Sequence, residues 1–216
     1  MRPLSSIAAV AAIISSLGLT ASPAMAAAEP AAPPPEAGSL QGKFLVANPS
    51  LPDPRFAHAV ILMVKHDATG AFGLVVNRPV GIAEVTPDTA EGKGGDGGPL
   101  VKREPLRLPA FLGGPVEPDK GFIIHTPEYK ADDTVAVTAR VAVTASAQIL
   151  ADMASGKGPK RTLYVVGYSG WKAGQLEEEM RRNSWFEAPV DAGLIFGGED
   201  TDAVWEQAME MRLRGI

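Results

Sequence analysis

Short apolar runs recur along the chain from Phe44 onward, and several of them are apolar at every position. Runs of this kind are typical of strands that are buried on both faces, so helices are expected to cover the sheet. The runs that predict strands are FLVA (44–47), AVILMV (59–64), FGLVV (72–76), AFLGG (110–114), GFIIHT (121–126), TVAVT (134–138), TLYVVGY (162–168) and GLIF (193–196).

Helical periodicity marks three further segments. Thr144 is expected to cap a helix that runs through ASAQILADMA and stops at Gly156. The segment QLEEEMRRN has acidic residues early and arginines late, which complements the helix dipole. The last segment, DAVWEQAMEMRLR, carries an apolar stripe and is expected to end at Gly215.

Two glycine-containing connections predict different structures. HDATGA joins two apolar runs as a hairpin, with Asp67 starting the turn and Gly70 taking a positive φ. EGKGGDGGP (91–99) lacks the Gly-Lys-Ser/Thr ending of a phosphate-binding loop and follows no strand directly, so a flexible insertion is expected there. Together the elements predict one α+β domain at 42–216, with a mixed sheet of about eight strands flanked by about three helices.

The first residues have the order of a secretory signal peptide. An early Arg2, an Ala/Ile/Leu-rich stretch and the triplet Ala24-Met25-Ala26 predict a leader at 1–26, cleaved after Ala26 or Ala28. An uncleaved membrane anchor would suit a longer apolar stretch, so no stable membrane span is expected after cleavage. Residues 27–41 are rich in proline and alanine and predict a disordered linker. A periplasmic or exported location follows, with a cytoplasmic one as the alternative.

Composition excludes several kinds of site. The chain has no cysteine, so thiol chemistry and disulfides are impossible. Its formal net charge is −5 and no run of Lys or Arg is longer than two residues, which argues against binding to nucleic acid. No cofactor motif is present.

Ser169 stands in GYSGWKAGQLEEE, after an apolar run and ahead of a helix, where some hydrolases keep their nucleophile. A nucleophile elbow reads Gly-x-Ser-x-Gly, because both glycines are needed for the strained turn. Trp171 occupies the second glycine position and is too bulky for it. We therefore expect Ser169 to be part of a turn and not catalytic.

The histidines are His58, His66 and His125. His66 beside Asp67 could form a base with its orienting carboxylate, but adjacent strand residues point to opposite faces. No His-x-x-x-His or His-Glu-x-x-His spacing brings two metal ligands together, so no metal site is expected. Asp67 as a turn former and His125 as a strand-end residue are the structural alternatives.

Asn77-Arg78-Pro79 and Gly113-Gly114-Pro115 both stand at the ends of apolar runs, where loops commonly build binding sites. Arg78 could hold a carboxylate or phosphate, and backbone amides near Gly113 and Gly114 could bind an anion. The glycines and prolines could equally serve only to end strands, with Arg78 paired internally to an acidic side chain. The aromatic residues Tyr168, Trp171, Trp185 and Trp205 are open to a core role or a partner surface.

Many motifs in order resemble the bacterial YqgE/AlgH family over residues 42–216. They are Phe44-Leu45-Val46-Ala47 with Pro49, Asp53-Pro54-Arg55-Phe56, His66-Asp67 through Gly70-Ala71, Gly73, Asn77-Arg78-Pro79, Leu112-Gly113-Gly114-Pro115-Val116, Gly121-Phe122, His125-Thr126, Gly167-Tyr168 with Trp171, Gly174-Gln175-Leu176-Glu177, Glu179, Asn183 and Trp185. The resemblance implies an α+β fold whose mixed sheet partly closes on itself. It implies no established molecular activity, and one branch is named for a proposed transcriptional regulator.

Three functions remain open at this point. The first is a non-catalytic protein that binds an unknown small ligand or protein partner, with a pocket among Asn77, Arg78, Gly113, Gly114 and His125. The second is an unrecognised hydrolase or transferase that uses His66, His125 or Glu179 as acid or base. The third is transcriptional regulation, suggested by the family name alone and opposed by the charge count. We expect the first, with His66, Tyr168, Trp171, Gln175 and Glu179 as further candidate site residues and no catalytic residue assigned.

Overall fold

The computed structural model describes residues 38–87, 104–197 and 200–214. These residues belong to one compact unit, Pro34–Ile216. The expected leader, most of the expected linker, the glycine-rich stretch at 91–99 and the expected helix end at Gly215 lie outside the described residues.

The described strands form a 10-stranded sheet that is antiparallel except where β5 pairs with β9. The strands are β1 (Lys43–Ala47), β2 (Val60–Asp67), β3 (Gly70–Val75), β4 (Pro79–Val85), β5 (Leu106–Leu112), β6 (Val116–His125), β7 (Val135–Thr138), β8 (Val141–Thr144), β9 (Thr162–Lys172) and β10 (Trp185–Pro189). The helices are the 3-10 turn η1 (Pro54–Phe56), α1 (Ala147–Ala154), α2 (Gln175–Arg181), α3 (Ala192–Phe196) and α4 (Thr201–Arg214). The expected α+β fold with a mixed sheet is confirmed.

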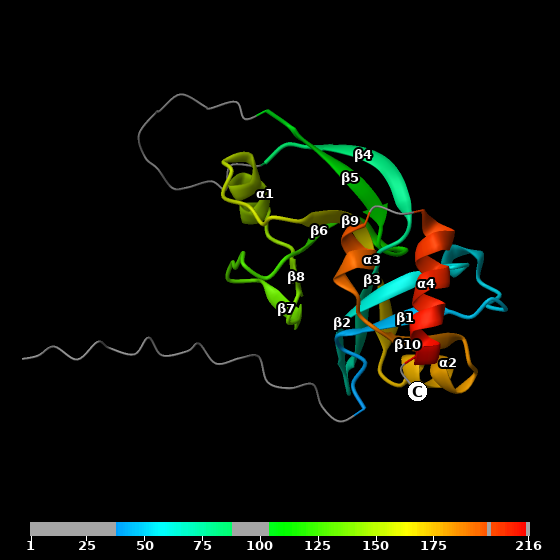
Figure 1. The fold of residues 1–216 in the computed structure, drawn as a ribbon. Coiled ribbons are helices and arrows are strands. Elements are labelled where there is room, and N and C mark those ends of the chain that lie inside the picture. Colours follow the sequence, from blue (N-terminus) through cyan, green and yellow to red (C-terminus); the bar gives the residue numbers. More distant parts are fainter. Residues whose placement is uncertain (1–37, 88–103, 198–199, 215–216) are drawn as a thin grey trace, which may run out of the picture. The chain divides into compact units, whose positions relative to one another are not determined.

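The sheet runs in the order β10-β1-β2-β3-β9-β6-β8-β7, and the β4–β5 hairpin is attached through β5 to β9 (Figure 1). The path is open, with β10 and β7 as its outer strands. It curls nevertheless, because β7 contacts β2. The residue before β1 also lies close to β7, since a methyl group built on Gly42 would come within 2.9 Å of the Val137 carbonyl oxygen.

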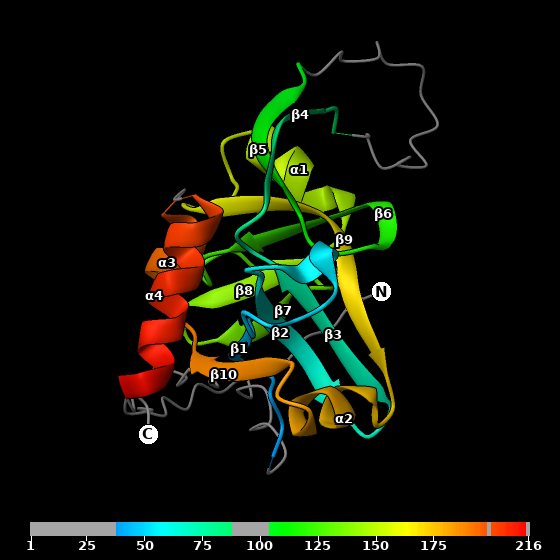
Figure 2. The ribbon, with the colours of Figure 1, turned by 90° about the vertical axis from the view of Figure 1, so that its right-hand side faces the viewer.

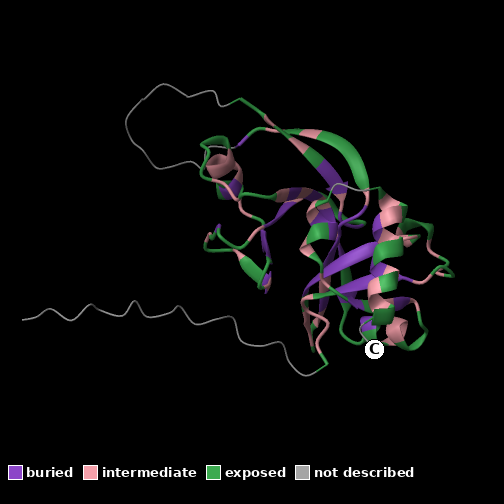
Figure 3. Ribbon diagram, viewed as in Figure 1, coloured by how far each residue is buried: buried purple, intermediate pink, exposed green. Residues whose placement is uncertain are grey.

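The apolar runs alternate between two buried layers, which explains why they are apolar at every position. Phe44 and Val46 of β1 face a core that α3 and α4 cover, which we call the α4 core. Leu45 and Ala47 face a second core with Leu176 of α2, which we call the α2 core. Figure 3 shows this burial along β1 to β3 and the contrasting exposure of β4.

The hairpin between β2 and β3 forms as expected. Asp67 lies opposite Gly70, and its Oδ1 accepts the backbone N–H of Thr69 at 2.8 Å. Gly70 has a φ of +136°, which is open to glycine and strained for other residues.

Three expectations about elements are wrong. GLIF forms the short helix α3 and not a strand, because the Asp191 side chain accepts the Gly193 N–H and caps a helical turn. Thr144 ends β8, and the N-cap position of α1 belongs to Ser146, whose backbone N–H is held by the Asp133 carboxylate at 2.7 Å. Strands β4, β8 and β10 are additional to the expected set.

Strand β9 is the centre of the sheet and carries a chain crossing. Residues of β5 and β6 pair with opposite edges of β9, so the segment between them passes over that strand (Figure 2). Gly113 and Gly114 allow this close approach, since a methyl group on Gly114 would lie 2.2 Å from the Tyr168 carbonyl carbon. A methyl group on Gly113 would meet the Gly167 carbonyl oxygen at 2.4 Å.

Candidate ligand-binding site

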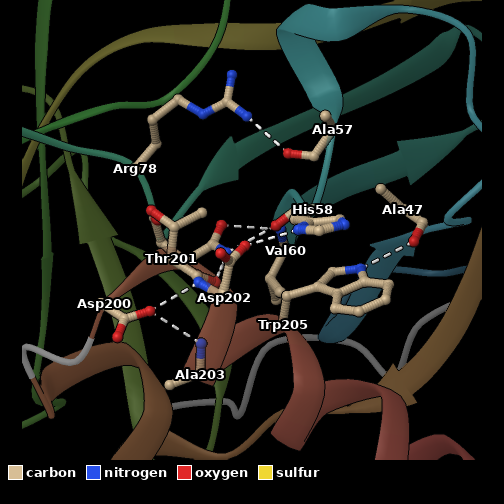
Figure 4. Close-up of polar contacts among 11 residues, drawn as sticks. Ala47, Ala57, His58, Val60, Arg78, Asp200, Thr201, Asp202, Ala203 and Trp205 are labelled. Carbon is tan, nitrogen blue, oxygen red and sulfur yellow. Dashed lines mark hydrogen bonds and ion pairs between the residues drawn. The ribbon is translucent and has the colours of Figure 1, made fainter.

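Asn77 is a buried cross-link between three segments. Its side-chain oxygen accepts the Val60 N–H at 2.9 Å, and its amide donates to the carbonyls of His58 at 2.8 Å and Thr201 at 2.9 Å. The Thr201 hydroxyl in turn donates to the Asn77 carbonyl, and Figure 4 shows the partner residues His58, Val60 and Thr201 close together. Asn77 is 1% exposed, so its amide is committed to the scaffold.

Arg78 holds the loop that contains η1. Its guanidinium donates to the backbone carbonyl of Arg55 and, at 2.8 Å, to that of Ala57. The internal partners of Arg78 are therefore carbonyls and not the acidic side chain that the sequence allowed. Arg78 also borders a small hollow of about 100 Å³ with Arg55, Gly114 and Pro115.

Gly113 contributes to the chain crossing with its peptide groups. Its N–H donates to the Val166 carbonyl at 2.8 Å, and its carbonyl accepts the Val75 N–H at 3.0 Å. The Gly113 amide is thus occupied within the fold and is not presented to an anion.

His125 is fully buried on β6 and uses both ring nitrogens. Its Nδ1 lies 2.9 Å from the Thr126 carbonyl and its Nε2 lies 2.9 Å from the Thr144 hydroxyl. The contact with a carbonyl requires a proton on Nδ1, and in the neutral ring that burial favours, Nε2 accepts from the Thr144 hydroxyl. Burial lowers the pKa of His125 below its ordinary value and so favours the neutral ring.

His66 joins the N-terminal segment to α2. Its Nδ1 accepts the Leu40 N–H at 3.0 Å, so Nε2 carries the proton and donates to Glu177 Oε1 at 2.9 Å. Asp67, the adjacent strand residue, contacts Lys65 at 2.9 Å and Thr69 and not His66, in agreement with its expected role in the turn. Hydrogen bonds from its own backbone and from His66 lower the pKa of Glu177.

Ser169 lies within β9, and the expectation that it forms a turn is wrong. The strand continues to Lys172 because Ser169 and its neighbours pair with β3. The hydroxyl is 2% exposed and donates to the Gly113 carbonyl at 3.1 Å. The Ser169 side chain therefore ties β9 to the segment that crosses it at Gly113.

A cavity of about 330 Å³ brings three of the sequence candidates together. They are Trp171, Gln175 and Glu179, contributed by β9 and α2. The rest of the lining is Leu51, Pro52, Asp53, Arg55, Phe56, Pro115, Val116, Ser169, Gly170, Ser184 and Trp185.

Glu179 organises the wall of this cavity. Its Oε2 accepts the indole N–H groups of Trp171 and Trp185, both at 2.8 Å, and its Oε1 accepts the Gln175 amide at 3.0 Å. Gln175 precedes Glu179 by one helical turn, so α2 places both side chains on one face. All three donors are neutral, and no cationic side chain among the described residues pairs with Glu179. Among the described residues, the carboxylate thus has no counter-ion at the cavity wall.

The other charged groups of the lining compensate each other. Arg55 contacts Asp53 through Nη2 at 2.7 Å and Nε at 3.1 Å, and this contact lowers the pKa of Asp53. The Asp53 carboxylate also accepts the Arg55 backbone N–H and so fixes η1. With this pair neutral overall, Glu179 sets the net charge of the cavity.

Tyr168 is a candidate that the structure places elsewhere. Its ring packs against Phe72 and Phe122 with centroid distances of 4.9 and 6.2 Å, on the face of β9 opposite Trp171. Its hydroxyl donates to Glu117 Oε1 at 3.1 Å. Burial, together with that bond, raises its pKa.

Asp53, Arg55 and Phe56 line the cavity but were not predicted as site residues, although they belong to the motif DPRF. A second polar pair was not predicted either: His58 Nδ1 lies 2.6 Å from Asp202 Oδ1, and the imidazole stacks on the Trp205 ring with centroids 4.3 Å apart (Figure 4). Sequence motifs give no signal for this pair, because His58 and Asp202 are far apart along the chain.

The remaining hollows and clusters offer less. A wider depression of about 730 Å³ lies between α3 and α4, lined by residues that include Asp191, Glu210 and Arg214. Within the described residues, no group of three or more His, Asp or Glu side chains is placed to hold a metal ion. No helix in the described ranges is long and apolar enough to cross a membrane.

Comparisons with known proteins agree with the fold. The chain is 39% identical over 160 residues to a UPF0301 protein of Pseudomonas entomophila, covering 73% of this chain and 81% of that one. It is 41% identical over 167 residues to a UPF0301 protein of Methylococcus capsulatus, covering 74% and 83%. The solution structure of the AlgH protein from Pseudomonas aeruginosa aligns with a TM-score of 0.63 and 32% identity, covering 86% of this chain and 93% of that one.

A crystal structure of the Corynebacterium diphtheriae protein DIP2367 shares the fold, with a TM-score of 0.59 at 21% identity, covering 87% of this chain and 90% of that one. The family model described as AlgH-like matches residues 44–213, which include every strand and helix of the described sheet except the first residue of β1 and the last of α4. The family has no characterised function. This chain therefore belongs to the AlgH-like family.

Proposed function

We propose that this protein is a non-catalytic binding protein whose cavity beside Trp171 and Glu179 recognises a cationic group of a ligand or partner. The observation that carries the proposal is the Glu179 carboxylate, which lines an open cavity and is held only by neutral donors. A carboxylate in a partly desolvated site favours a cation, and two indole rings beside it exclude water.

Most side chains that could do acid–base or nucleophilic chemistry are engaged in hydrogen bonds within the fold, which favours a binding role. Ser169 donates its hydroxyl to a carbonyl, and His66 and His125 have both ring nitrogens in hydrogen bonds. A hydrolase or transferase needs such a group free to reach the substrate. Glu179 is the one earlier candidate for an acid or base that lines the cavity.

The competing class of function would use His58. Asp202 orients the imidazole through Nδ1, and the side chain of His58 is 44% exposed. Stacking on Trp205 gives the ring a structural role as well. If the protein were an acid–base catalyst, His58→Gln would remove turnover of any substrate found later while leaving cation binding at Glu179 unchanged.

Nuclear magnetic resonance of the indole N–H groups tests the proposal directly. The chain has three tryptophans, two in the cavity wall and Trp205, whose indole donates to the Ala47 carbonyl outside it. Titration with n-butylammonium and methylguanidinium should shift the Trp171 and Trp185 signals saturably and leave Trp205 unmoved. Acetate is the matched anionic probe and should shift neither.

Glu179→Gln should abolish the saturable shift, whereas Glu206→Gln removes the same charge from the exposed surface of α4 and should preserve it. A wild-type protein whose cavity indoles show no saturable response to either cation would refute the proposed function.

We also propose that the protein acts in the periplasm or outside the cell. The support is the composition of residues 1–26, with an early arginine, an apolar stretch and a small-x-small triplet. Fractionation of the native cells with mass spectrometry of the mature N-terminus tests it. A periplasmic product that begins at Ala27 or Glu29 is expected, and a cytoplasmic product that begins at Met1 would contradict it.

A further inference from the structure

One edge of β9 ends beside the cavity without a partner among the described strands. Its direction follows from the β2–β3 hairpin, which closes with Asp67 opposite Gly70 across a two-residue turn. The closing pair of such a hairpin exchanges both backbone hydrogen bonds, so the peptide groups of Gly70 face β2. Because peptide groups alternate along a strand, those of Ala71 and Gly73 face β9.

The register with β3 then assigns the edges of β9. Trp171 and Ser169 lie opposite Ala71 and Gly73, so their peptide groups point to β3. Those of Gly170 and Lys172 point the other way. The Lys172 N–H agrees with this assignment, since it donates to the Gln175 side chain at 3.2 Å and not to β3.

The far edge of β9 is occupied by β6 only as far as Tyr168. Val116 is the last residue of β6 to pair there, and the chain before it is Pro115, which has no N–H to donate. Among the described strands, β9 pairs with β3, β5 and β6 alone. The peptide group of Gly170 is therefore left at an edge that no described strand covers.

Gly170 also has the space that a partner needs. It is exposed and lines the cavity, and a methyl group built on it would meet only the Tyr168 ring within 4 Å. A strand placed along this edge would have alternate side chains on the face of Trp171. That face carries Phe56, Trp185 and the uncompensated carboxylate of Glu179.

We propose that the cavity binds an extended peptide segment of a partner protein, which adds as a strand to β9 at Gly170 and directs a lysine or arginine side chain to Glu179. This inference rests on the proposed function and names its ligand class. Backbone bonds to Gly170 give the contact its direction, and the basic side chain gives it selectivity. The partner residue beside the basic one lies opposite Gly170.

The probe is the acetylated and amidated peptide Thr-Val-Lys-Val-Thr, titrated into the isotope-labelled full chain. The indole signals of Trp171 and Trp185 should shift while that of Trp205 stays, and amide exchange of Gly170 should slow by about tenfold or more at saturation. The same peptide methylated on both valine nitrogens cannot form the edge bonds and should bind about tenfold more weakly. A glutamate in place of lysine should abolish binding.

The outcomes separate the two proposals. Equal binding of the parent and N-methylated peptides, with Gly170 exchange unchanged, would overturn strand addition and leave cation binding intact. The same conclusion follows if n-butylammonium shifts the two cavity indoles but the lysine peptide does not. If neither the peptide nor the small cations shift them, the proposed function and this inference both fail. Loss of peptide binding in Glu179→Gln but not in Glu206→Gln is the result that supports both.

Discussion

Asn77 and Glu179 are two polar centres that tie distant segments together, and they differ in what they have left to offer. Asn77 is neutral and fully buried, and its amide is hydrogen-bonded to backbone groups of Val60 in β2, of His58 and of Thr201 in α4. Glu179 is charged and half-buried, and it accepts three neutral donors from β9, α2 and β10 beside a cavity. The difference shows that a polar residue is a candidate for ligand binding only if the fold leaves it with charge or hydrogen-bonding capacity that faces a cavity.

The largest effect is expected from a variant that removes the Asn77 centre. Asn77→Ala leaves the Val60 N–H and the carbonyls of His58 and Thr201 without partners in a buried place. Unfolding in urea should show a loss of about 3 kcal/mol of stability. Gln148→Ala on the exposed face of α1 is the control and should cost less than about 0.5 kcal/mol. If Asn77→Ala lost no more stability than the control, the three backbone groups would have found water in place of the amide as their hydrogen-bond partner.

A smaller effect is expected at the second centre. Glu179→Ala leaves two indole N–H groups unpaired at the partly open cavity and should cost about 2 kcal/mol in urea unfolding. Glu179→Gln keeps an acceptor oxygen and should recover more than half of that loss. Equal losses for both variants would mean that charge, and not hydrogen bonding, holds the tryptophans.

A pH experiment sharpens the contrast between neutral scaffold and charged cavity. His125 is buried neutral and its pKa is lowered from the ordinary 6.5, so below that pH the unfolded chain takes up a proton that the folded chain does not. Stability contributed by the neutral ring is present above pH 6.5 and falls as pH falls towards the folded pKa, by at most about 1.4 kcal/mol per pH unit. Resonances of the His125 ring should titrate below 6.5. A midpoint at or above the ordinary value would contradict the neutral assignment.

The smallest effect is expected at Ser169. Ser169→Ala removes one buried hydrogen bond to the Gly113 carbonyl, which keeps the Val75 N–H as a donor. The expected cost is about 1 kcal/mol or less in thermal or urea unfolding. Loss of a cellular function in this variant with stability intact would restore Ser169 as a functional residue.

Sequence patterns predicted the central strands and the fold because those segments are apolar at consecutive positions and are long enough to be unambiguous. The GLIF run shows the limit, since four apolar residues suit a strand or a helix and the Asp191 cap decides between them. Strand β4 escaped prediction because its exposed face carries Val80 and Ile82 and its pairing depends on β5.

The candidate site was predicted in part. Trp171, Gln175 and Glu179 were named from the motif that carries them, and the structure places all three in one cavity wall. Asn77, Arg78 and His125 were chosen from their places at strand ends, and their partners are backbone groups or hydroxyls from remote segments. Such partners depend on tertiary packing, which local spacing does not encode. The cavity loop with Asp53 and Arg55 was missed for the same reason.

The central position of β9 has a consequence for the order in which the chain folds. β3, β5 and β6 are all synthesised before β9, and each must pair with it. The glycine crossing at Gly113 and Gly114 lies directly on β9, so its closest contacts form only when that strand is present. The sheet therefore cannot be completed before β9 has been synthesised, and the pairings that complete it join residues far apart in sequence, which is expected to slow folding.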